Sequence, residues 1–160
     1  MPKKSNYILG VDPSSKCLGI CVLKDGKPVL TTHYKPNPKL DVSRKLYEAS
    51  AFLQDVKKEY GKFSVVGVEQ LSYFRNKHTV RVLCYFEGAA LLKAGQWNCP
   101  IYQVKPNDAR RAVLGAAPDK KETFKIMKKK GYKFAATEEG LDECDATVVA
   151  LAAYRQARYK

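Results

Sequence analysis

The sequence predicts an α/β fold with a central mixed sheet of five strands flanked by helices. Three apolar runs near the start are separated only by short turns, and the later apolar runs alternate with helical patterns. Short turns join antiparallel strands, whereas strands separated by a helix usually pair in parallel. We therefore expect three antiparallel strands and then parallel ones, in a single domain that spans residues 1–160.

The first three strands are predicted from apolar runs at residues 7–11, 18–23 and 29–34. The turn-forming sequences Pro-Ser-Ser at 13–15 and Asp-Gly-Lys at 25–27 separate them. The third run is rich in Val, Leu, Thr and Tyr, most of which favour strands. These features predict two consecutive hairpins at the start of the chain.

The remaining elements follow from hydrophobic periodicity and from start and stop signals. We expect, in order, a helix that begins at Asp41 or Ser43 and stops at Gly61, a strand at 64–68, a helix at 77–94, a strand at 101–104, short helices at 107–114 and 119–130, and a last helix at 143–158. No internal repeat or linker interrupts this order. The helix at 77–94 carries more apolar residues than one buried face needs, which fits core packing or a subunit interface.

The charge balance favours a polyanionic partner such as nucleic acid. The chain has 29 Lys and Arg against 16 Asp and Glu, a net charge of +13. Between Lys105 and Lys133 there are ten basic and three acidic residues, so this stretch alone contributes +7. A solvated helix face is the alternative interpretation of such a lysine run.

Cysteine usage and hydropathy exclude several classes of protein. The five cysteines form no CxxC pair and only two histidines are present, which argues against a zinc site. The apolar stretch near the N-terminus is too short for a signal peptide, and no run reaches the roughly 18 apolar residues of a membrane span. We expect no membrane segment, free thiols and a cytoplasmic location.

Two of the predicted strands end at an acidic residue. Asp12 follows the first apolar run, and Glu69 follows the run at 64–68. In open α/β sheets, functional sites form at the carboxyl ends of the strands. We therefore expect the Asp12 and Glu69 carboxylates to converge.

Two further acids lie near the start of the last predicted helix. Asp142 and Asp145 are three residues apart, so both side chains point to one face of the helix. Capping of the helix amides is the alternative role for this pair. With Asp12 and Glu69 they form a set of four oxygen ligands, which suits hard divalent cations such as Mg²⁺. A basic surface that holds phosphates, together with such a metal site, predicts phosphodiester hydrolysis.

Four segments of the sequence resemble motifs of the RuvC-like Holliday junction resolvases. They are ILGVDPSSKCLGICVL at 8–23, GVEQ at 67–70, RAVLGAAPDKKE at 111–122 and LDECDATVVALAAYR at 141–155. They occur in the order of the family's motifs and span nearly the whole chain. The set is more specific than any one of its members.

The resemblance implies an RNase H-like fold, a homodimer, and an endonuclease of DNA recombination and repair that resolves four-way junctions and other branched DNA by paired nicks. It implies that Asp12, Glu69, Asp142 and Asp145 are the catalytic metal ligands, with Mg²⁺ as cofactor and Mn²⁺ as a substitute. The short basic chain is most similar to phage-type members, which would place it in the cytoplasm of a host cell.

The expected DNA contacts fall in two segments. The family's basic segment corresponds to the region of Arg110 and Lys121, and we expect contacts there from Arg110, Arg111, Lys120 and Lys121. Behind Glu69, aromatic residues stand beside cations, a combination that suits base stacking and phosphate contact. The expected contacts in this loop are Tyr73, Phe74, Arg75 and Lys77.

Three other functions share part of this pattern. Sugar kinases and actin-like ATPases also begin with a strand, an aspartate and a hairpin, but they need two such domains and a second phosphate loop. An RNase H-like nuclease acting on RNA or RNA–DNA hybrid would use the same acids. A non-catalytic DNA-binding relative would keep the basic surface only.

Overall fold

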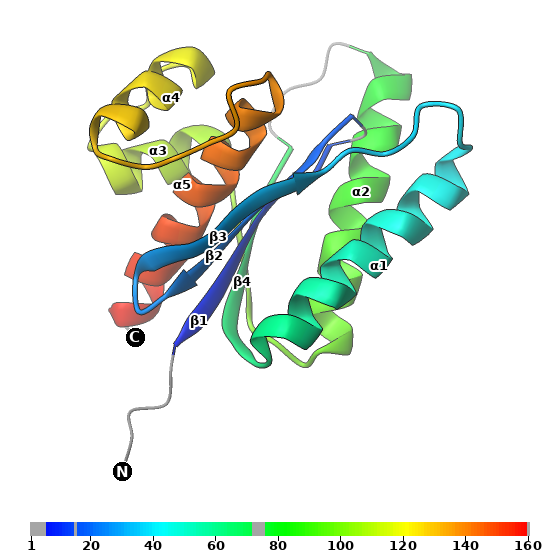
Figure 1. The fold of residues 1–160 in the computed structure, drawn as a ribbon, viewed down its shortest axis with the longest axis horizontal. Helices are drawn as coiled ribbons and strands as arrows, with labels where there is room; N and C mark the ends of the chain where they lie inside the picture. The colour runs from blue at the N-terminus through cyan, green and yellow to red at the C-terminus, as the bar shows by residue number, and fades with distance from the viewer. Residues whose placement is uncertain (1–5, 15, 72–75, 160) are drawn as a thin grey trace.

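The computed structural model describes residues 6–14, 16–71 and 76–159. Its centre is one five-stranded sheet with the strand order β3-β2-β1-β4-β5. Helices α1 and α2 cover one face of this sheet, and α3, α4 and α5 lie on the other (Figure 1). The expected α/β class with helices on both sides of the sheet is confirmed.

The strands follow the predicted pairing. They are β1 Tyr7–Asp12, β2 Leu18–Lys24, β3 Lys27–Tyr34, β4 Phe63–Glu69 and β5 Ile101–Val104. Strands β1, β2 and β3 are antiparallel neighbours, whereas β4 pairs in parallel with β1 and β5. The prediction of antiparallel strands followed by parallel ones is therefore confirmed.

The helices are α1 Val42–Tyr60, α2 Lys77–Gln96, α3 Pro106–Leu114, α4 Lys120–Lys129 and α5 Glu139–Arg158. Of the two proposed caps of α1, Asp41 is the one used, because its carboxylate accepts from the Arg44 amide at 2.9 Å. Gly61 ends the helix at a φ of 76°.

The last helix begins earlier than the sequence predicted. We expected a start near residue 143, but α5 begins at Glu139, and its N-cap position is occupied by Glu138 without a side-chain cap bond. Asp142 and Asp145 therefore lie inside the helix, and neither occupies the cap position. Their side chains project from consecutive turns of the same face.

Helix α5 packs very closely on the sheet because the facing strand residues are glycines. A Cβ at Gly10 of β1 would overlap the carbonyl oxygen of Ala146 and lie 2.6 Å from the Cβ of Ala150. A Cβ at Gly19 of β2 would overlap the carbonyl oxygen of Asp142. This close approach brings the acidic turns of α5 against the carboxyl end of β1.

The opposite face of the sheet is filled by larger side chains. Phe63 and Phe86 are among the largest fully buried residues there, and α1 packs against α2. The outer side of α2 carries two large apolar residues that face solvent, since Tyr85 is 45% and Leu92 is 61% exposed. None of the described helices combines the length and the apolarity that crossing a bilayer requires.

Candidate metal centre

Two of the four predicted acids meet at the carboxyl edge of the sheet. Asp12 is the last residue of β1 and Glu69 is the last residue of β4. These strands are parallel neighbours, with Val11 opposite Val68, so both chains leave the sheet at the same edge. Asp12 is buried and Glu69 is partly buried, which places both carboxylates away from bulk water.

Helix α5 adds the third acid of this group. Asp145 is buried, and Asp12, Glu69 and Asp145 can each offer one oxygen such that all three oxygens lie within 4.8 Å of one another. Asp142 lies one turn earlier on α5 and lines a cavity together with Asp12 and Glu69, but it is not a member of this set among the described residues. The structure thus brings three predicted ligands together and places the fourth beside them.

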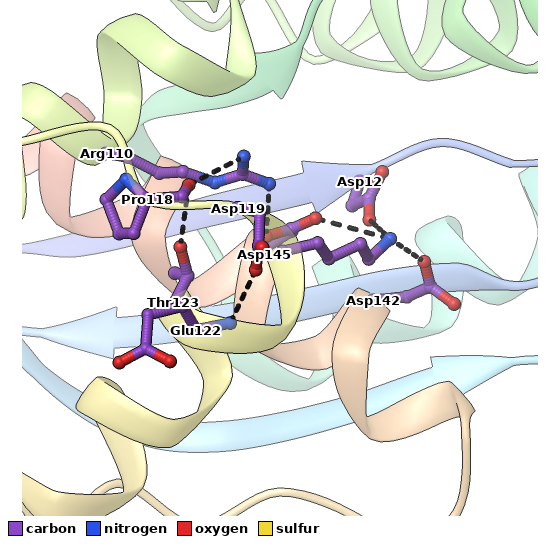
Figure 2. Close-up of polar contacts among 9 residues, drawn as sticks. Asp12, Arg110, Pro118, Asp119, Glu122, Thr123, Asp142 and Asp145 are labelled. Carbon is purple, nitrogen blue, oxygen red and sulfur yellow. Dashed lines mark hydrogen bonds and ion pairs between the residues drawn. The ribbon is translucent and has the colours of Figure 1, made fainter.

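The ammonium of Lys120 lies among these carboxylates (Figure 2). Its Nζ is 2.8 Å from Asp142 Oδ1, 3.3 Å from Asp145 Oδ2 and 3.9 Å from Asp12 Oδ2. We expected Lys120 on a DNA-binding surface, and the structure instead turns it into the acidic pocket. The reason is that Lys120 is the first residue of α4, and α4 packs against α5, which carries Asp142 and Asp145.

The protonation of the site reflects its burial. Burial raises the pKa of Asp12 well above its usual value, and the neighbouring Glu69 and Asp145 carboxylates raise it further. Burial, and then Asp145, raise the pKa of Glu69 to about 8. Burial alone would lower the pKa of Lys120, but the surrounding carboxylates outweigh it and raise that pKa. One ammonium therefore does not balance the negative charge gathered here.

The residues present fit a hard divalent cation. The donors are carboxylate oxygens, which Mg²⁺ and Mn²⁺ prefer over nitrogen and sulfur ligands. Asp12 Oδ2 is buried and has no hydrogen-bond partner among the described residues. An oxygen left in this state costs free energy unless a cation or a proton meets it. The site therefore favours a cation that supplies more positive charge than Lys120 does.

Arg110 also departs from its expected place. We predicted a surface contact to DNA, but its side chain is 10% exposed and lies between α3 and α5. Its Nη2 donates to Asp145 Oδ1 at 3.3 Å, and its Nη1 donates to the Pro118 carbonyl at 3.3 Å. The guanidinium of Arg110 therefore points toward Asp145 of the metal site and not into solvent.

The other predicted DNA contacts divide into two groups. Arg111, Lys121 and Lys77 are exposed, as a contact to DNA requires, and Arg111 pairs with Asp108 at 3.1 Å. Tyr73, Phe74 and Arg75 lie outside the described residues. The prediction of DNA contacts remains a prediction for all of them.

A cavity of about 190 Å³ opens beside the acids. Besides Asp12, Glu69, Asp142 and Lys120, it is lined by Pro13, Ser14, Leu71, Leu83 and Glu87. Glu87 of α2 accepts a hydrogen bond from Gln103 Nε2 at 3.0 Å and brings a further carboxylate to the cavity. The sequence pattern did not single it out. Its only signal was an i,i+4 spacing from Leu83, which alone does not show which way that face points.

Comparison with known proteins identifies the family. The sequence model for crossover junction endodeoxyribonuclease RuvC matches residues 8–153. The chain belongs to the RuvC family. This membership confirms the resemblance drawn from the motifs and argues against the sugar-kinase alternative.

Curated RuvC proteins align over most of the chain. The crossover junction endodeoxyribonuclease RuvC of Myxococcus xanthus is 32% identical over 149 residues, covering 90% of this chain and 78% of the relative. That of Campylobacter curvus is 31% identical over 150 residues, covering 90% and 93%.

Solved structures support the fold. A RuvC from T. thermophilus in complex with a Holliday junction substrate has a TM-score of 0.78 at 20% identity and covers 96% of both chains. The yeast mitochondrial Holliday junction resolvase Ydc2 has a TM-score of 0.59 at 14% identity, covering 94% of this chain and 79% of its own. The expected RNase H-like architecture is therefore confirmed.

Proposed function

We propose that the protein is a crossover junction endodeoxyribonuclease that resolves Holliday junctions and other branched DNA by paired, metal-dependent phosphodiester nicks. The observation that carries this proposal is the convergence of Asp12, Glu69 and Asp145, two of them buried and one partly buried, in a chain that belongs to the RuvC family. A non-catalytic DNA-binding relative would have no need to gather buried acids at this cost.

Asp12, Glu69 and Asp145 would hold the metal, with Asp142 beside them as the fourth acid. Mg²⁺ bound here would supply a Lewis acid that lowers the pKa of a water and neutralises charge on the phosphate. Mn²⁺ should replace it, because both ions prefer oxygen ligands. Lys120 holds the carboxylates together by its charge and competes for the same oxygens that a metal would use.

The basic surface would hold the DNA backbone next to this site. Exposed Arg111 and Lys121 lie on α3 and α4, close in sequence to the residues that line the cavity. Cations of this kind bind phosphates irrespective of base sequence. Selectivity for branched DNA therefore has to come from the shape of the substrate and from the spacing of two active sites.

A homodimer would supply two such sites. Symmetric nicking of a four-way junction needs sites related by a two-fold axis. The exposed apolar side of α2, which includes Tyr85 and Leu92, is the surface we assign to the subunit contact. Helix α2 also carries Leu83 and Glu87 to the cavity, so a contact along α2 would lie close to the active site.

The proposal is tested with Mg²⁺ and a panel of duplex, single-stranded, flap, four-way and RNA–DNA hybrid substrates. We expect cleavage of the branched DNAs, with the four-way junction cut at paired positions. Asp12→Asn and Asp145→Asn should each reduce the rate by orders of magnitude while junction binding in Ca²⁺ persists, since the change removes a ligand and not a phosphate contact.

Asp55→Asn is the matched control, because Asp55 is an exposed acid on α1 away from the cavity. This variant should cut at the wild-type rate. Cutting of the RNA–DNA hybrid in preference to the junction would overturn the proposed substrate. Wild-type rates for both Asp12→Asn and Asp145→Asn would overturn the proposed metal site.

A further inference from the structure

We infer that Arg110 is a positioning residue that fixes the orientation of the Asp145 carboxylate for metal-dependent cleavage; this inference rests on the proposed function. The two oxygens of Asp145 are held by different cations. Arg110 Nη2 donates to Oδ1, and Lys120 Nζ lies 3.3 Å from Oδ2 (Figure 2). Because Arg110 occupies Oδ1, the carboxylate presents Oδ2 toward Lys120 and the neighbouring acids.

Arg110 is itself fixed at its other amino group. Its Nη1 donates to the Pro118 carbonyl, which also accepts from the buried hydroxyl of Thr123 at 3.4 Å. Pro118 directly precedes Asp119, which caps α4 by accepting from the Glu122 amide at 2.8 Å. The guanidinium of Arg110 therefore links Asp145 of α5 to the segment before α4, whose first residue is Lys120.

Two other roles for Arg110 fit the structure less well. A phosphate contact needs exposure, and this side chain is 10% exposed. A purely structural ion pair between α3 and α5 would carry the desolvation cost of two buried charges. Well-packed apolar side chains of similar size often stabilise such a contact more. An arginine is needed here only if the orientation of the Asp145 carboxylate matters. Side chains that orient metal ligands by hydrogen bonds from outside the coordination shell have this role.

Loss of Arg110 should lower the cleavage rate and leave metal binding and junction binding largely unchanged. In Arg110→Met, the Oδ1 atom of Asp145 loses its donor and the carboxylate can rotate. The cleavage rate at saturating Mg²⁺ and junction should fall by roughly ten- to a hundredfold, the range found for such outer residues. The metal should bind at least as tightly, because the substitution removes a positive charge that repels it. Junction affinity in Ca²⁺ should stay within about threefold, since Arg110 does not reach the surface.

The experiment compares Arg110→Met, Arg110→Lys and Arg155→Met with the wild-type protein. Arg110→Lys keeps the charge but cannot hold Asp145 and Pro118 at once, so it should cut faster than Arg110→Met and slower than wild type. Arg155→Met is the matched control, because Arg155 of α5 also bonds α3, at the carbonyls of Ala112 and Val113, and pairs with none of the acids that the structure describes. Four quantities are measured: single-turnover cleavage, Mn²⁺ affinity of the DNA-free protein by calorimetry, junction affinity in Ca²⁺, and melting temperature.

The expected result is a lower rate in both Arg110 variants with Mn²⁺ and junction affinity kept, and a wild-type rate in Arg155→Met whatever its melting temperature. The inference is overturned if Arg110→Met cuts as fast as wild type, if excess metal restores its rate, or if junction affinity falls as much as the rate. If wild-type protein itself fails to cut, the proposed function is wrong, whereas normal wild-type cleavage with a fully active Arg110→Met removes this inference alone.

Discussion

The helices on the two faces of the sheet approach the strands in different ways. On the α5 face, Gly10 of β1 lies against Ala146 and Ala150, and Gly19 of β2 lies against the backbone of Asp142. On the α1 and α2 face, large side chains such as those of Phe63 and Phe86 are fully buried between the helices and the sheet. The acids Asp142 and Asp145 come from the closely packed face, whereas the exposed apolar residues Tyr85 and Leu92 lie on α2 of the other.

The difference indicates how the fold divides its tasks. A helix in contact with the backbone of a strand has little freedom to shift, because any movement creates either a clash or a void. This holds Asp145 at a fixed distance from Asp12. On the other face, core side chains can be replaced by others of similar volume at a cost that is usually below about 1.5 kcal/mol. Its helix α2 has exposed apolar residues that are available for a subunit contact.

The largest expected effect is on the α5 face. Gly10→Ala would drive a methyl group into the Ala146 carbonyl and the Ala150 side chain, so α5 has to move away from β1. We expect a loss of about 3 kcal/mol or more in the free energy of unfolding, measured by urea denaturation. The cleavage rate should fall further than the smaller fraction of folded protein explains, because Asp145 moves with α5.

Gly88→Ala is the control for this substitution on the other face. Gly88 lies in α2 with nothing within 4 Å of the position of a Cβ, so alanine should not lower stability and can raise it by up to about 1 kcal/mol. Equal effects at Gly10 and Gly88 would contradict the contrast between the two faces.

The pH dependence of the free energy of unfolding tests whether folding raises the pKa values of Glu69 and Asp12. The folded-state pKa of Glu69 is about 8, above its usual value of 4.5, and that of Asp12 is also raised. The metal-free protein therefore holds protons that the unfolded chain releases. Their stabilising contribution is full below pH 4.5 and is lost as the pH rises through about 8.

We expect the melting temperature in EDTA to fall between pH 5.5 and 8.5, and saturating Mg²⁺ to oppose this fall because the cation replaces the protons. Glu69→Gln should flatten the EDTA curve, since it removes the titrating group at that position. An EDTA curve for the wild-type protein that coincides with that of Glu69→Gln would show that Glu69 is ionised throughout.

Much of this architecture could be predicted from the sequence, because its signals are local. Apolar runs that stop at Asp12 and Glu69 placed both acids at strand ends, and a capping aspartate and a glycine marked the limits of α1. The structure puts these features where the patterns indicated. The convergence of the two acids followed from one rule about the edges of parallel strands.

The direction of the basic side chains could not be predicted in this way. Arg110, Arg111, Lys120 and Lys121 form two adjacent pairs, and in each pair one cation turns inward and the other outward. Which one turns inward depends on how α3 and α4 are rotated against α5, and tertiary packing sets that rotation. Glu87 was missed for the same reason, because its place in the cavity depends on the orientation of α2.

The outer side of α2 carries the proposed subunit contact. Leu92 is 61% exposed, and a glutamate there should place a charge within the proposed subunit contact. Leu92→Glu should shift the protein from dimer toward monomer in light scattering at micromolar concentration, because a buried unpaired charge opposes association. Its melting temperature should change little relative to the wild-type monomer. A wild-type protein that scatters as an 18.0 kDa species while resolving junctions would contradict the proposed dimer.

The smallest expected effect separates the cations that point to solvent from those that face the acids on the α5 side. Arg111 and Lys121 are exposed, whereas their neighbours Arg110 and Lys120 face the acids. If the exposed pair contacts phosphates, the double substitution Arg111→Ala and Lys121→Ala should reduce the slope of log K against log salt by about 1.8, since each lost phosphate contact contributes about 0.9. Arg110→Met should leave that slope unchanged. Junction affinity is measured in Ca²⁺ from 50 to 200 mM salt, so that cleavage does not interfere. A slope that falls for Arg110→Met and not for the double variant would mean that the bound protein exposes Arg110 to the DNA, and the division into inward and outward cations would then hold only for the free chain.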